Sequence, residues 1–373
     1  MDSSRLVPFI IGLLFIPIVK RVFARLTLAK PKSSQENSSS NGIYNLSHGK
    51  LNLNPEVPMW MSMGYWSETS IDDKPTTLAV ASRMLLSEVL KTAGFCRKRQ
   101  SMEDSKGERR TKALIDLGFG CGEQTIYINS PIPLRISDKE WWDTQPNVER
   151  FDYIGITLDK HQFRYAETRL QELHHPDRKM EILKRHPRYS ENTQIFQGDA
   201  AKPENWDRAL QSHILETIQH VDEVWVLGLD AFYHFSPSRW PVIHYASHQL
   251  NANLMAFDLC LARDISLINT VALRLLTALM GAPWANFVSE EQYRDNLVAA
   301  GYQDVLIKDV SDDVFGPLSE FLQKHDYKLR AIGEGLGQFH LAKWMFSWWA
   351  RTGIVRGVIV IAKKSGGKES QSR

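Results

Sequence analysis

The feature that most constrains the fold is an apolar run that contains an acid and continues into three closely spaced glycines. It reads Ala113-Leu-Ile-Asp-Leu-Gly-Phe-Gly-Cys-Gly-Glu-Gln124. Glycine lets the backbone turn sharply from a strand into a helix and approach a ligand closely, and the free N–H groups at a helix start attract negative charge. The stretch therefore predicts a strand, a tight turn and a helix arranged around a bound molecule.

The spacing of these glycines differs from that of the dinucleotide-binding fingerprint. That fingerprint needs a glycine three residues after its second one, and Glu123 stands at that position after Gly120. An acid inside the turn would also repel a pyrophosphate. We therefore expect a ligand with a cationic amino group and a smaller anionic carboxylate, which suits Asp116 and this loop better.

From residue 113 onward, short apolar runs alternate with stretches of helical periodicity. The apolar runs predict strands at 113–117, 153–158, 193–197, 223–229, 253–257, 304–308 and 354–362. Helical spacing is clearest at 160–173, 203–219, 238–250 and 290–300. Strands separated by crossover helices indicate an α/β fold with a doubly wound, mostly parallel sheet of seven strands. In such sheets a ligand binds at the carboxyl ends of the strands.

Composition and charge exclude several classes of function. Hydrophobic residues make up 43% and charged residues 24% of the 373 residues, as in ordinary globular proteins, so fibrous and fully disordered chains are excluded. The formal net charge of +2 lacks the basic excess of a dedicated nucleic-acid binder, and we expect no nucleic-acid partner. Cys96, Cys121 and Cys260 are too few and too scattered for a disulfide framework or a CxxC zinc site, so we expect a reducing compartment and no metal.

The amino-terminal segment is typical of an anchoring or targeting element. Leu6 to Val19 is largely apolar, and Lys20, Arg21 and Arg25 follow it closely. At about 1.5 Å per residue this run is shorter than a ~30 Å hydrocarbon layer, so it predicts a short or shallow membrane anchor over residues 6–23. The basic residues after it predict a membrane-associated protein whose body faces the cytosol, at the endoplasmic reticulum. A mitochondrial presequence is the alternative, because residues 1–32 are basic.

The polar and apolar stretches also suggest a division of the chain. The expected parts are a hydrophobic segment at 1–30, a flexible linker at 31–55, a helical cover with a basic loop at 56–112, the main domain at 113–364 and a disordered tail at 365–373. Two insertions, at about 263–288 and 315–350, interrupt the main domain. Their apolar and aromatic residues predict the walls of a hydrophobic pocket for the acceptor. For each single residue, packing against the sheet is the alternative.

Four segments in register resemble a known family. They are Asp116-Leu-Gly-Phe-Gly-Cys-Gly122, Gly155-Ile-Thr-Leu-Asp-Lys-His-Gln162, Gly198-Asp-Ala200 and Leu229-Asp-Ala-Phe-Tyr-His-Phe235, each at the end of a predicted strand. Together they are similar to the motifs of S-adenosylmethionine-dependent methyltransferases with a Rossmann-like fold, in the cyclopropane-synthase-like branch that acts on small molecules. The resemblance covers about residues 65–364.

The resemblance implies which residues bind S-adenosylmethionine. Asp116 would hold the methionyl amino group, with backbone access at the glycines. Thr157 and Gln162 would face the ribose, where many relatives have an acid instead. Asp199 would accept from the adenine amino group, and Ala200 would offer its N–H. The full implied set is Tyr65, Asp116, Gly118, Gly120, Gly122, Thr157, Gln162, Asp199, Ala200 and Leu229. For Tyr65, core packing is the alternative.

The implied reaction is methyl transfer, which depends mainly on holding the acceptor close to the methyl group and aligned with it. A base is needed only if the acceptor carries a proton, and His234 is the candidate, with Asp230 to orient the ring or bind the acceptor. Alternatively, both residues merely line the cofactor pocket. Relatives with a second carboxylate have it where this chain has Tyr233, which weakens a cyclopropane-synthase function.

The acceptor is expected to be a small, lipophilic molecule, because the insertions are apolar and the amino terminus is expected at a membrane. Two alternatives stay open. One is a protein methyltransferase, and the other is a membrane-tethered binding module that keeps the fold without turnover. The sequence does not reveal the oligomeric state or whether an O, N or C atom is methylated.

Overall fold

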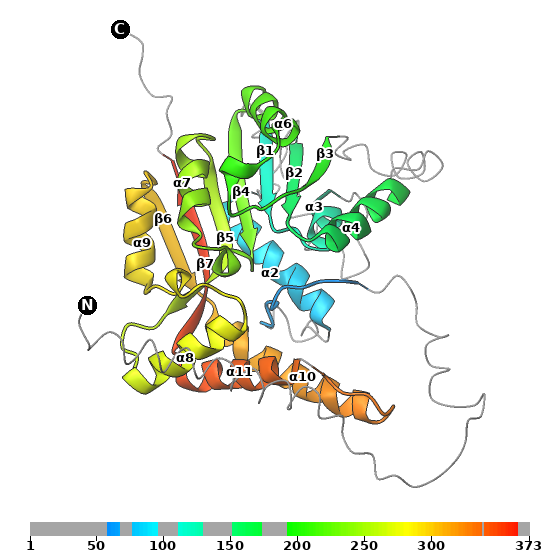
Figure 1. The fold of residues 1–373 in the computed structure, drawn as a ribbon, viewed down its shortest axis with the longest axis vertical. Coiled ribbons are helices and arrows are strands. Elements are labelled where there is room, and N and C mark those ends of the chain that lie inside the picture. The colour runs from blue at the N-terminus through cyan, green and yellow to red at the C-terminus, as the bar shows by residue number, and fades with distance from the viewer. Residues whose placement is uncertain are drawn as a thin grey trace, which may run out of the picture. The chain divides into compact units, whose positions relative to one another are not determined.

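In the computed structural model, the described residues form one seven-stranded sheet (Figure 1). The model describes residues 58–67, 77–95, 111–129, 151–173, 192–337 and 339–364. The strands are β1 (Lys112–Leu117), β2 (Phe151–Thr157), β3 (Thr193–Gln197), β4 (Glu223–Leu229), β5 (Asn253–Leu261), β6 (Asp304–Asp309) and β7 (Val355–Lys363). Their order across the sheet is β3-β2-β1-β4-β5-β7-β6.

The direction of the strands refines the expected parallel sheet. β1, β2, β3, β4 and β5 pair in parallel, whereas β7 runs antiparallel between β5 and β6. The α/β class is confirmed, and the sheet is mixed rather than wholly parallel. β3 and β4 have the predicted bounds, but β5 continues past the predicted end at Phe257 to Leu261. The extension pairs residue by residue with β7, so its register depends on a strand that lies far away in sequence.

Helices occupy most of the segments between the strands. They are α2 (Leu78–Ala93), α3 (Glu123–Asn129), α4 (Lys160–Leu173), α6 (Arg208–Gln219), α7 (Trp240–His248), α8 (Leu267–Leu279), α9 (Glu290–Ala299), α10 (Phe315–Arg330) and α11 (Phe339–Thr352). Single 3₁₀ turns are η4 (Pro203–Asn205), η5 (Phe232–His234), η6 (Trp284–Asn286) and η7 (Ser311–Asp313). Side chains that accept from free N–H groups begin several helices, for example Asp207 before α6 and Ser289 before α9.

The described residues fall into two units. Residues 322–345 belong to one, in which the Asp326 carboxylate accepts hydrogen bonds from Arg330 and Lys343 at 3.0 and 3.1 Å. The remaining described residues belong to the other, which we call the sheet unit because it contains all seven strands. The expected anchor, the linker and the tail, together with most of the basic loop, lie outside the described residues.

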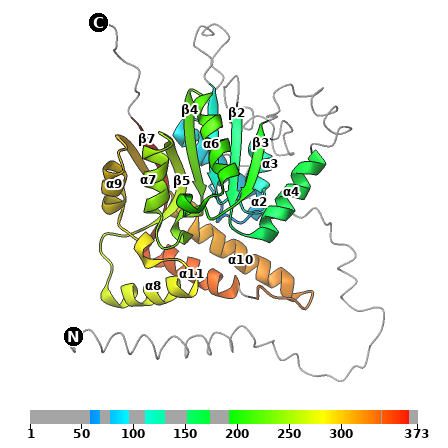
Figure 2. The same cartoon turned by 45° about the horizontal axis from the view of Figure 1, so that its top comes forward.

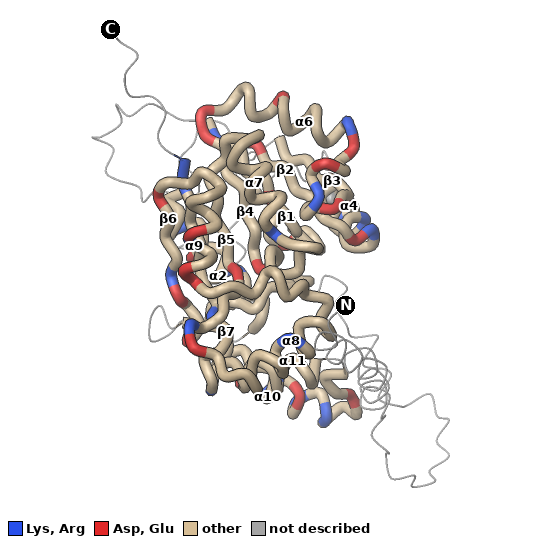
Figure 3. Tube along the Cα trace, turned by 60° about the vertical axis from the view of Figure 1, so that its left-hand side comes forward, with Lys and Arg blue, Asp and Glu red and all other residues tan. Residues whose placement is uncertain are grey.

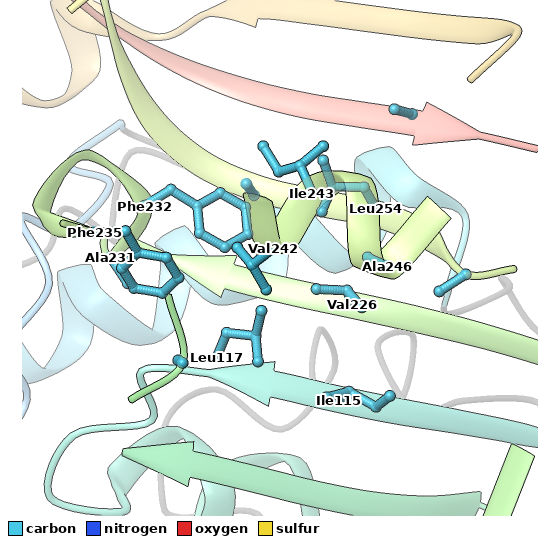
Figure 4. Packing of buried hydrophobic residues seen from close by; sticks show 14 of the residues in the cluster. Ile115, Leu117, Val226, Ala231, Phe232, Phe235, Val242, Ile243, Ala246 and Leu254 are labelled. Atoms are coloured by element: carbon cyan, nitrogen blue, oxygen red, sulfur yellow. The ribbon is translucent and has the colours of Figure 1, made fainter. Parts of the chain in front are cut away.

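Apolar side chains from the sheet and from α6, α7 and α9 form a continuous core. Ile115 and Val226 on neighbouring strands meet Val242 and Ile243 of α7, all nearly inaccessible to water (Figure 4). The opposite layer includes α2, which contacts β5, β7 and α3. Lys, Arg, Asp and Glu lie mainly on helices, in turns and on β6, while β4 and β5 carry few (Figure 3). Burial of these apolar faces is what holds the strands in register.

The strand order reverses between β1 and β4. From β1 the chain proceeds to β2 and β3 on one side, and from β4 to β5 on the other. Connections that depart to opposite sides leave an opening at the carboxyl ends of the two central strands. Figure 4 shows β1 and β4 pointing the same way, with Leu117 and Ala231 near these ends. The predicted turn at 118–122 and the predicted motif at 229–235 therefore meet at this switch point.

The two insertions differ from the expected pocket walls. The broad apolar side of α8 faces outward: Leu267, Ile268, Val271 and Leu275 are exposed, while Leu273, Leu276 and Thr277 face the protein. In the second insertion, the ring of Phe315 packs on Phe346 and Trp349, and Phe321 packs on Trp66. These aromatic residues follow the core-packing alternative. Sequence periodicity locates an apolar face but does not show which way it points.

Membrane-spanning helices and metal-binding clusters can be assessed only in the described residues. Among them, no helix combines the length and apolar character that a bilayer crossing requires. Likewise, no three or more His, Cys, Asp or Glu side chains in this part of the chain form a group suited to a metal ion. The apolar run at residues 6–23 lies outside the described residues.

A buried ion pair joins four segments behind the switch point. The Arg239 guanidinium, inaccessible to water, pairs with Asp258 of β5, whose carboxylate also accepts from Tyr293 of α9 at 2.8 Å. The Arg239 backbone N–H donates to the Asn286 side chain at 2.8 Å. The NH₂ group of the Asn286 side chain donates to the carbonyls of Tyr233 and Phe235 at 3.1 and 2.8 Å. The network thus fixes the loop after β4 to β5, α9 and η6.

We predict that Asp258→Ala destabilises the protein by about 3–5 kcal/mol, because it leaves the Arg239 cation buried and unpaired. Urea denaturation followed by circular dichroism measures the change. Replacing both partners, as in Arg239→Met with Asp258→Leu, should restore most of the loss. Glu291→Ala removes an exposed partner of Arg263 and should change stability by less than about 1 kcal/mol. A loss no larger for Asp258→Ala than for Glu291→Ala would contradict the role assigned to the network.

Candidate functional site

The three glycines of the turn meet different constraints. Gly118, Gly120 and Gly122 have φ angles of 94°, 64° and 87°, a region that side chains disfavour. A Cβ at Gly118 would lie 2.9 Å from Ala231 Cβ, and one at Gly122 would lie 2.8 Å from Ala166 Cβ. These two glycines allow the turn to pack against the loop after β4 and against α4. At Gly120, the Met61 sulfur is the one atom of the described residues within 4 Å of the Cβ position, at 3.4 Å, so Gly120 is where the turn can receive a ligand.

Asp116 lies beneath the turn and is inaccessible to water. Gln124 donates to both carboxylate oxygens at 2.8 and 2.9 Å, and the Tyr153 hydroxyl donates to one at 2.5 Å. Burial raises the pKa of Asp116 to about 6, partly offset by the hydrogen bonds from Tyr153 and Gln124. The acid therefore links β1 to β2 and to α3, and both of its oxygens already have protein partners. Its predicted contact with an amino group remains a prediction.

Residues 58–66, which we call the strap, cross the switch point. The Met59 N–H donates to Glu123 at 2.8 Å, just after the glycine turn, and the Met63 N–H donates to Asp230 at 2.6 Å, just after β4. Between them, the Met61 sulfur lies over Gly120 and accepts from the Gln162 amide at 3.6 Å. The strap is thus fastened at both ends above the predicted cofactor residues.

The end of the strap is held by close packing against α2. A Cβ at Gly64, where φ is +79°, would lie 2.6 Å from Ala81 Cβ. The indole N–H of the buried Trp66 donates to the Met63 carbonyl at 2.9 Å. These contacts explain two residues of the segment Met63-Gly-Tyr-Trp66. Glycine permits the close approach of the strap to α2, and the tryptophan side chain holds the turn through its hydrogen bond to Met63.

Asp230 occupies the first position after β4 in a left-handed backbone conformation, with φ at 58°. Its backbone N–H donates to Phe257 of β5 at 3.0 Å. Burial raises the pKa of its carboxyl to about 7, partly offset by hydrogen bonds from the Met63 N–H and the Tyr233 hydroxyl. The carboxyl group therefore changes charge near neutral pH while it anchors the strap.

His234 ends the turn η5 and has an exposed side chain whose ring centre lies 4.2 Å from that of Tyr233. Partial desolvation by the surrounding protein lowers the pKa of the imidazole from 6.5, so the ring is neutral at pH 7. A neutral imidazole can accept a proton. Burial of Tyr233 raises the pKa of its phenol well above 10, so this hydroxyl stays protonated.

The residues after β2 form a small polar group. The Thr157 hydroxyl donates to the Gln162 side chain at 3.2 Å, and the amide of Gln162 reaches the Met61 sulfur. Asp159 accepts the backbone N–H groups of His161 and Gln162, both at 2.8 Å, and so begins α4. The structure thus brings Thr157 and Gln162 together, with Met61 between Gln162 and Gly120, and their predicted contact with a ribose remains a prediction. Asp159 as the helix start was missed, although an acid before a helical stretch signals it.

Asp199 follows β3 and is partly exposed. One carboxylate oxygen accepts from the Ala201 N–H at 3.0 Å, and the other pairs with Lys202 at 3.0 Å. The indole of Trp206 donates to the Asp199 carbonyl at 2.9 Å. Ala200 is buried, as is Leu229 at the end of β4. The loop at Asp199 is therefore held rigidly, and an adenine amino group would compete with Lys202 for its carboxylate.

Tyr65 hydrogen bonds within the fold, and its predicted contact with the methionyl end of the cofactor remains a prediction. Its N–H donates to Ala81 at 2.8 Å, and its hydroxyl hydrogen bonds to Ser67 and Asp313. Desolvation raises the pKa of this hydroxyl, so it is un-ionised at neutral pH. The strap residue over the glycine turn is instead Met61. Nothing in the sequence distinguishes Met61 from its neighbouring methionines, because the difference arises from the path of the strap.

Comparison with known proteins supports the fold. No family model matches the sequence, and no curated protein matches it. Among solved structures, a putative sarcosine dimethylglycine methyltransferase from Galdieria sulphuraria is 14% identical with a TM-score of 0.50, covering 82% of this chain and 94% of that one. This likeness shows a shared Rossmann-like α/β fold.

Two further structures are similar at lower scores. A cyclopropane synthase from Mycobacterium tuberculosis is 15% identical with a TM-score of 0.49, covering 82% of this chain and 90% of that one. A geranyl diphosphate C-methyltransferase from Streptomyces coelicolor is 13% identical with a TM-score of 0.46, covering 83% of this chain and 92% of that one.

We predict that Asp230 makes the protein less stable as pH rises from about 4 to about 7. The pKa of its carboxyl is about 7 in the folded protein against an ordinary 3.8, so the folded state holds the proton more tightly. Each unit of difference corresponds to about 1.4 kcal/mol. Asp230→Asn keeps an acceptor for Met63 and tolerates the left-handed backbone, so this part of the pH dependence should disappear.

Urea denaturation at several pH values tests the effect of Asp230 on stability. The free energy of unfolding of the wild type relative to Asp230→Asn should fall across this range by a few kcal/mol. Asp304→Asn, at an exposed acid of β6, should leave the pH dependence unchanged. Parallel curves for the wild type and Asp230→Asn would show that the carboxyl does not titrate in this range.

Proposed function

We propose that this chain is an S-adenosylmethionine-dependent methyltransferase that modifies a small, lipophilic acceptor. The observation that carries the proposal is the glycine turn at the switch point, which is open to a ligand at Gly120 and crossed by the strap. Thr157, Asp199 and Asp230 stand at or just after the carboxyl ends of β2, β3 and β4, at the same edge of the sheet as this turn. The shared fold with a putative methyltransferase supports the proposal.

The residues present fit the proposed cofactor. The turn after β1 offers backbone at Gly120 without a Cβ, which a close-lying methionyl group requires. Thr157 and Gln162 offer neutral hydroxyl and amide groups for ribose hydroxyls, while Asp199 and the Ala200 N–H suit the adenine edge. The full binding set is Tyr65, Asp116, Gly118, Gly120, Gly122, Thr157, Gln162, Asp199, Ala200 and Leu229, in which Asp116 shapes the turn from beneath. When bound, the cofactor supplies an electrophilic methyl group.

The chain's contribution to catalysis is to position the acceptor and receive its proton. His234 and Asp230 follow the same strand, β4, and the buried network of Arg239 and Asn286 holds the loop that contains His234. His234 is exposed and neutral at pH 7, so its imidazole can accept a proton from an acceptor. Asp230 fastens the strap through Met63, which limits access of water from that side.

The lipophilic acceptor and the membrane association are further parts of this proposal. The apolar run at residues 6–23 and the basic residues after it favour a membrane anchor with the folded part on the cytosolic side, at the endoplasmic reticulum. A mitochondrial location is the alternative. A protein methyltransferase and a binding module without turnover are the competing functions, and each gives a different result in the assays below.

We predict that Gly120→Leu weakens S-adenosylmethionine binding at least about tenfold, because its side chain would project where the turn is open. Isothermal titration calorimetry measures the affinity. The matched control is Gly94→Leu, since Gly94 has a similar φ of 67° and no atom of the described residues within 4 Å of its Cβ position, but lies at the end of α2. Both variants carry similar backbone strain, so the binding site at Gly120 is supported only if Gly120→Leu loses affinity and Gly94→Leu does not. Equal affinity in the two variants would rule it out.

We predict that His234→Ala lowers kcat by about 10² or more if the acceptor carries a proton, because the base is lost. In the wild type, kcat/KM should rise with pH through the lowered pKa of His234 and level off by neutral pH. This rise should be absent in the variant. His248→Ala, at an exposed histidine of α7, should retain the wild-type profile. Full turnover by His234→Ala would show that His234 is not the base and that catalysis depends on positioning of the acceptor.

The acceptor class is tested by incubating the full chain with methyl-labelled S-adenosylmethionine and a whole-cell extract. Solvent partition then separates lipids, water-soluble compounds and protein. Label in the organic phase supports a lipophilic acceptor, and label in the protein fraction supports protein methylation. Cofactor binding without label in any fraction favours a binding module.

A further inference from the structure

One face of α8 is apolar and exposed. The exposed fractions are 85% for Leu267, 82% for Ile268, 59% for Val271 and 45% for Leu275. Successive helix positions turn by about 100°, so these four side chains occupy one side of the helix. The opposite side holds Leu273, Leu276 and Thr277, which are buried. We call the four exposed residues the α8 stripe.

The stripe is unlike an ordinary solvent-facing helix surface. The thirteen residues of α8 contain no acid and one charged residue, Arg274. The Arg274 guanidinium lies at the edge of the stripe, 4.9 Å from the centre of the Trp284 ring. Large contiguous apolar patches on a protein surface mark contact with another apolar phase or molecule. A cation beside such a patch favours a surface that is both apolar and anionic.

We propose that the α8 stripe inserts into the interface of a phospholipid bilayer. Leu267, Ile268, Val271 and Leu275 enter the boundary between headgroups and acyl chains, and Arg274 lies at the level of the lipid phosphates. Figure 2 shows α8, in yellow, apart from the layer of α6, α7 and α9, so insertion leaves the core intact. The proposal assigns the folded domain a membrane contact of its own.

The chain outside the described residues favours a bilayer over other occupants. Its apolar run, Leu6 to Val19, is followed by Lys20, Arg21 and Arg25, so it suits the same kind of surface. Residues 24–57 separate this run from the strap, and at about 3.3 Å per residue they reach up to ~110 Å. A terminus held at a bilayer therefore leaves the folded domain free to reach the same bilayer and raises the local concentration of the stripe there.

The stripe contact does not depend on methyl transfer. It uses neither the glycine turn nor His234, and its measurement needs no cofactor and no acceptor. Failure of the membrane contact would leave the proposed activity standing, and failure of the activity would leave the contact standing.

A depth-sensitive label tests the contact in the full chain. Cys96 is replaced by Ser, since Cys121 and Cys260 are buried, and Ile268→Cys is labelled with an environment-sensitive fluorophore. Vesicles of phosphatidylcholine with about 30% phosphatidylserine are then added. We expect a blue shift, a several-fold rise in emission and quenching by lipids brominated on the acyl chains. The control is the same label at Leu215→Cys, an exposed apolar position of α6, where emission should not change.

A second variant separates the stripe from the amino-terminal run. Leu267→Glu with Val271→Glu should reduce the response at position 268 at least tenfold, although the amino-terminal run is intact. Equal responses at positions 215 and 268, or none at 268, would overturn the proposal. A shift without vesicles would also overturn it, assigning the stripe to a second copy if the shift depends on protein concentration and to the chain itself if it does not.

Discussion

The site depends on how closely the chain after β1 approaches the chain after β4. Gly118 and Ala231 come so near that a Cβ on the glycine would lie 2.9 Å from the alanine Cβ. This approach brings the glycine turn and the β4 loop to the same edge of the sheet. The parallel pairing of β1 with β4 and the burial of their apolar side chains enforce it. The strap then spans the resulting opening by bonding to Glu123 on one side and to Asp230 on the other.

Local sequence signals located the sheet and the turn well, because both depend on short-range chemistry. Apolar runs of strand length predicted β3 and β4 to the residue, and the glycines predicted the tight turn, in which all three have a positive φ. The motifs after β1, β2 and β4 predicted which residues would gather at the carboxyl edge, since parallel strands end on the same side. What these signals did not contain was the antiparallel β7, which pairs with two strands distant in sequence.

Tertiary contacts decide what local sequence signals leave open. Asp116 was predicted as a ligand-binding acid, but whether its oxygens are free depends on Gln124 and Tyr153, which only the folded chain brings to it. The direction of the α8 stripe likewise depends on which side of the helix the domain covers. Arg239 gave no sequence signal at all, yet its pairing with Asp258 and its bonds to Asn286 secure the loop that carries His234.

The insertion that contains α8 leaves the sheet and returns to it at nearly the same point. Leu261 at the end of β5 forms a bridge with Ser289, and its N–H donates to the Val288 carbonyl at 2.8 Å. The intervening residues therefore form an insertion whose two ends are held side by side by the sheet. Such an insertion can change in length or sequence during evolution without altering the register of any strand. Selection can thus modify what this region contacts while the residues around Gly120 stay as they are.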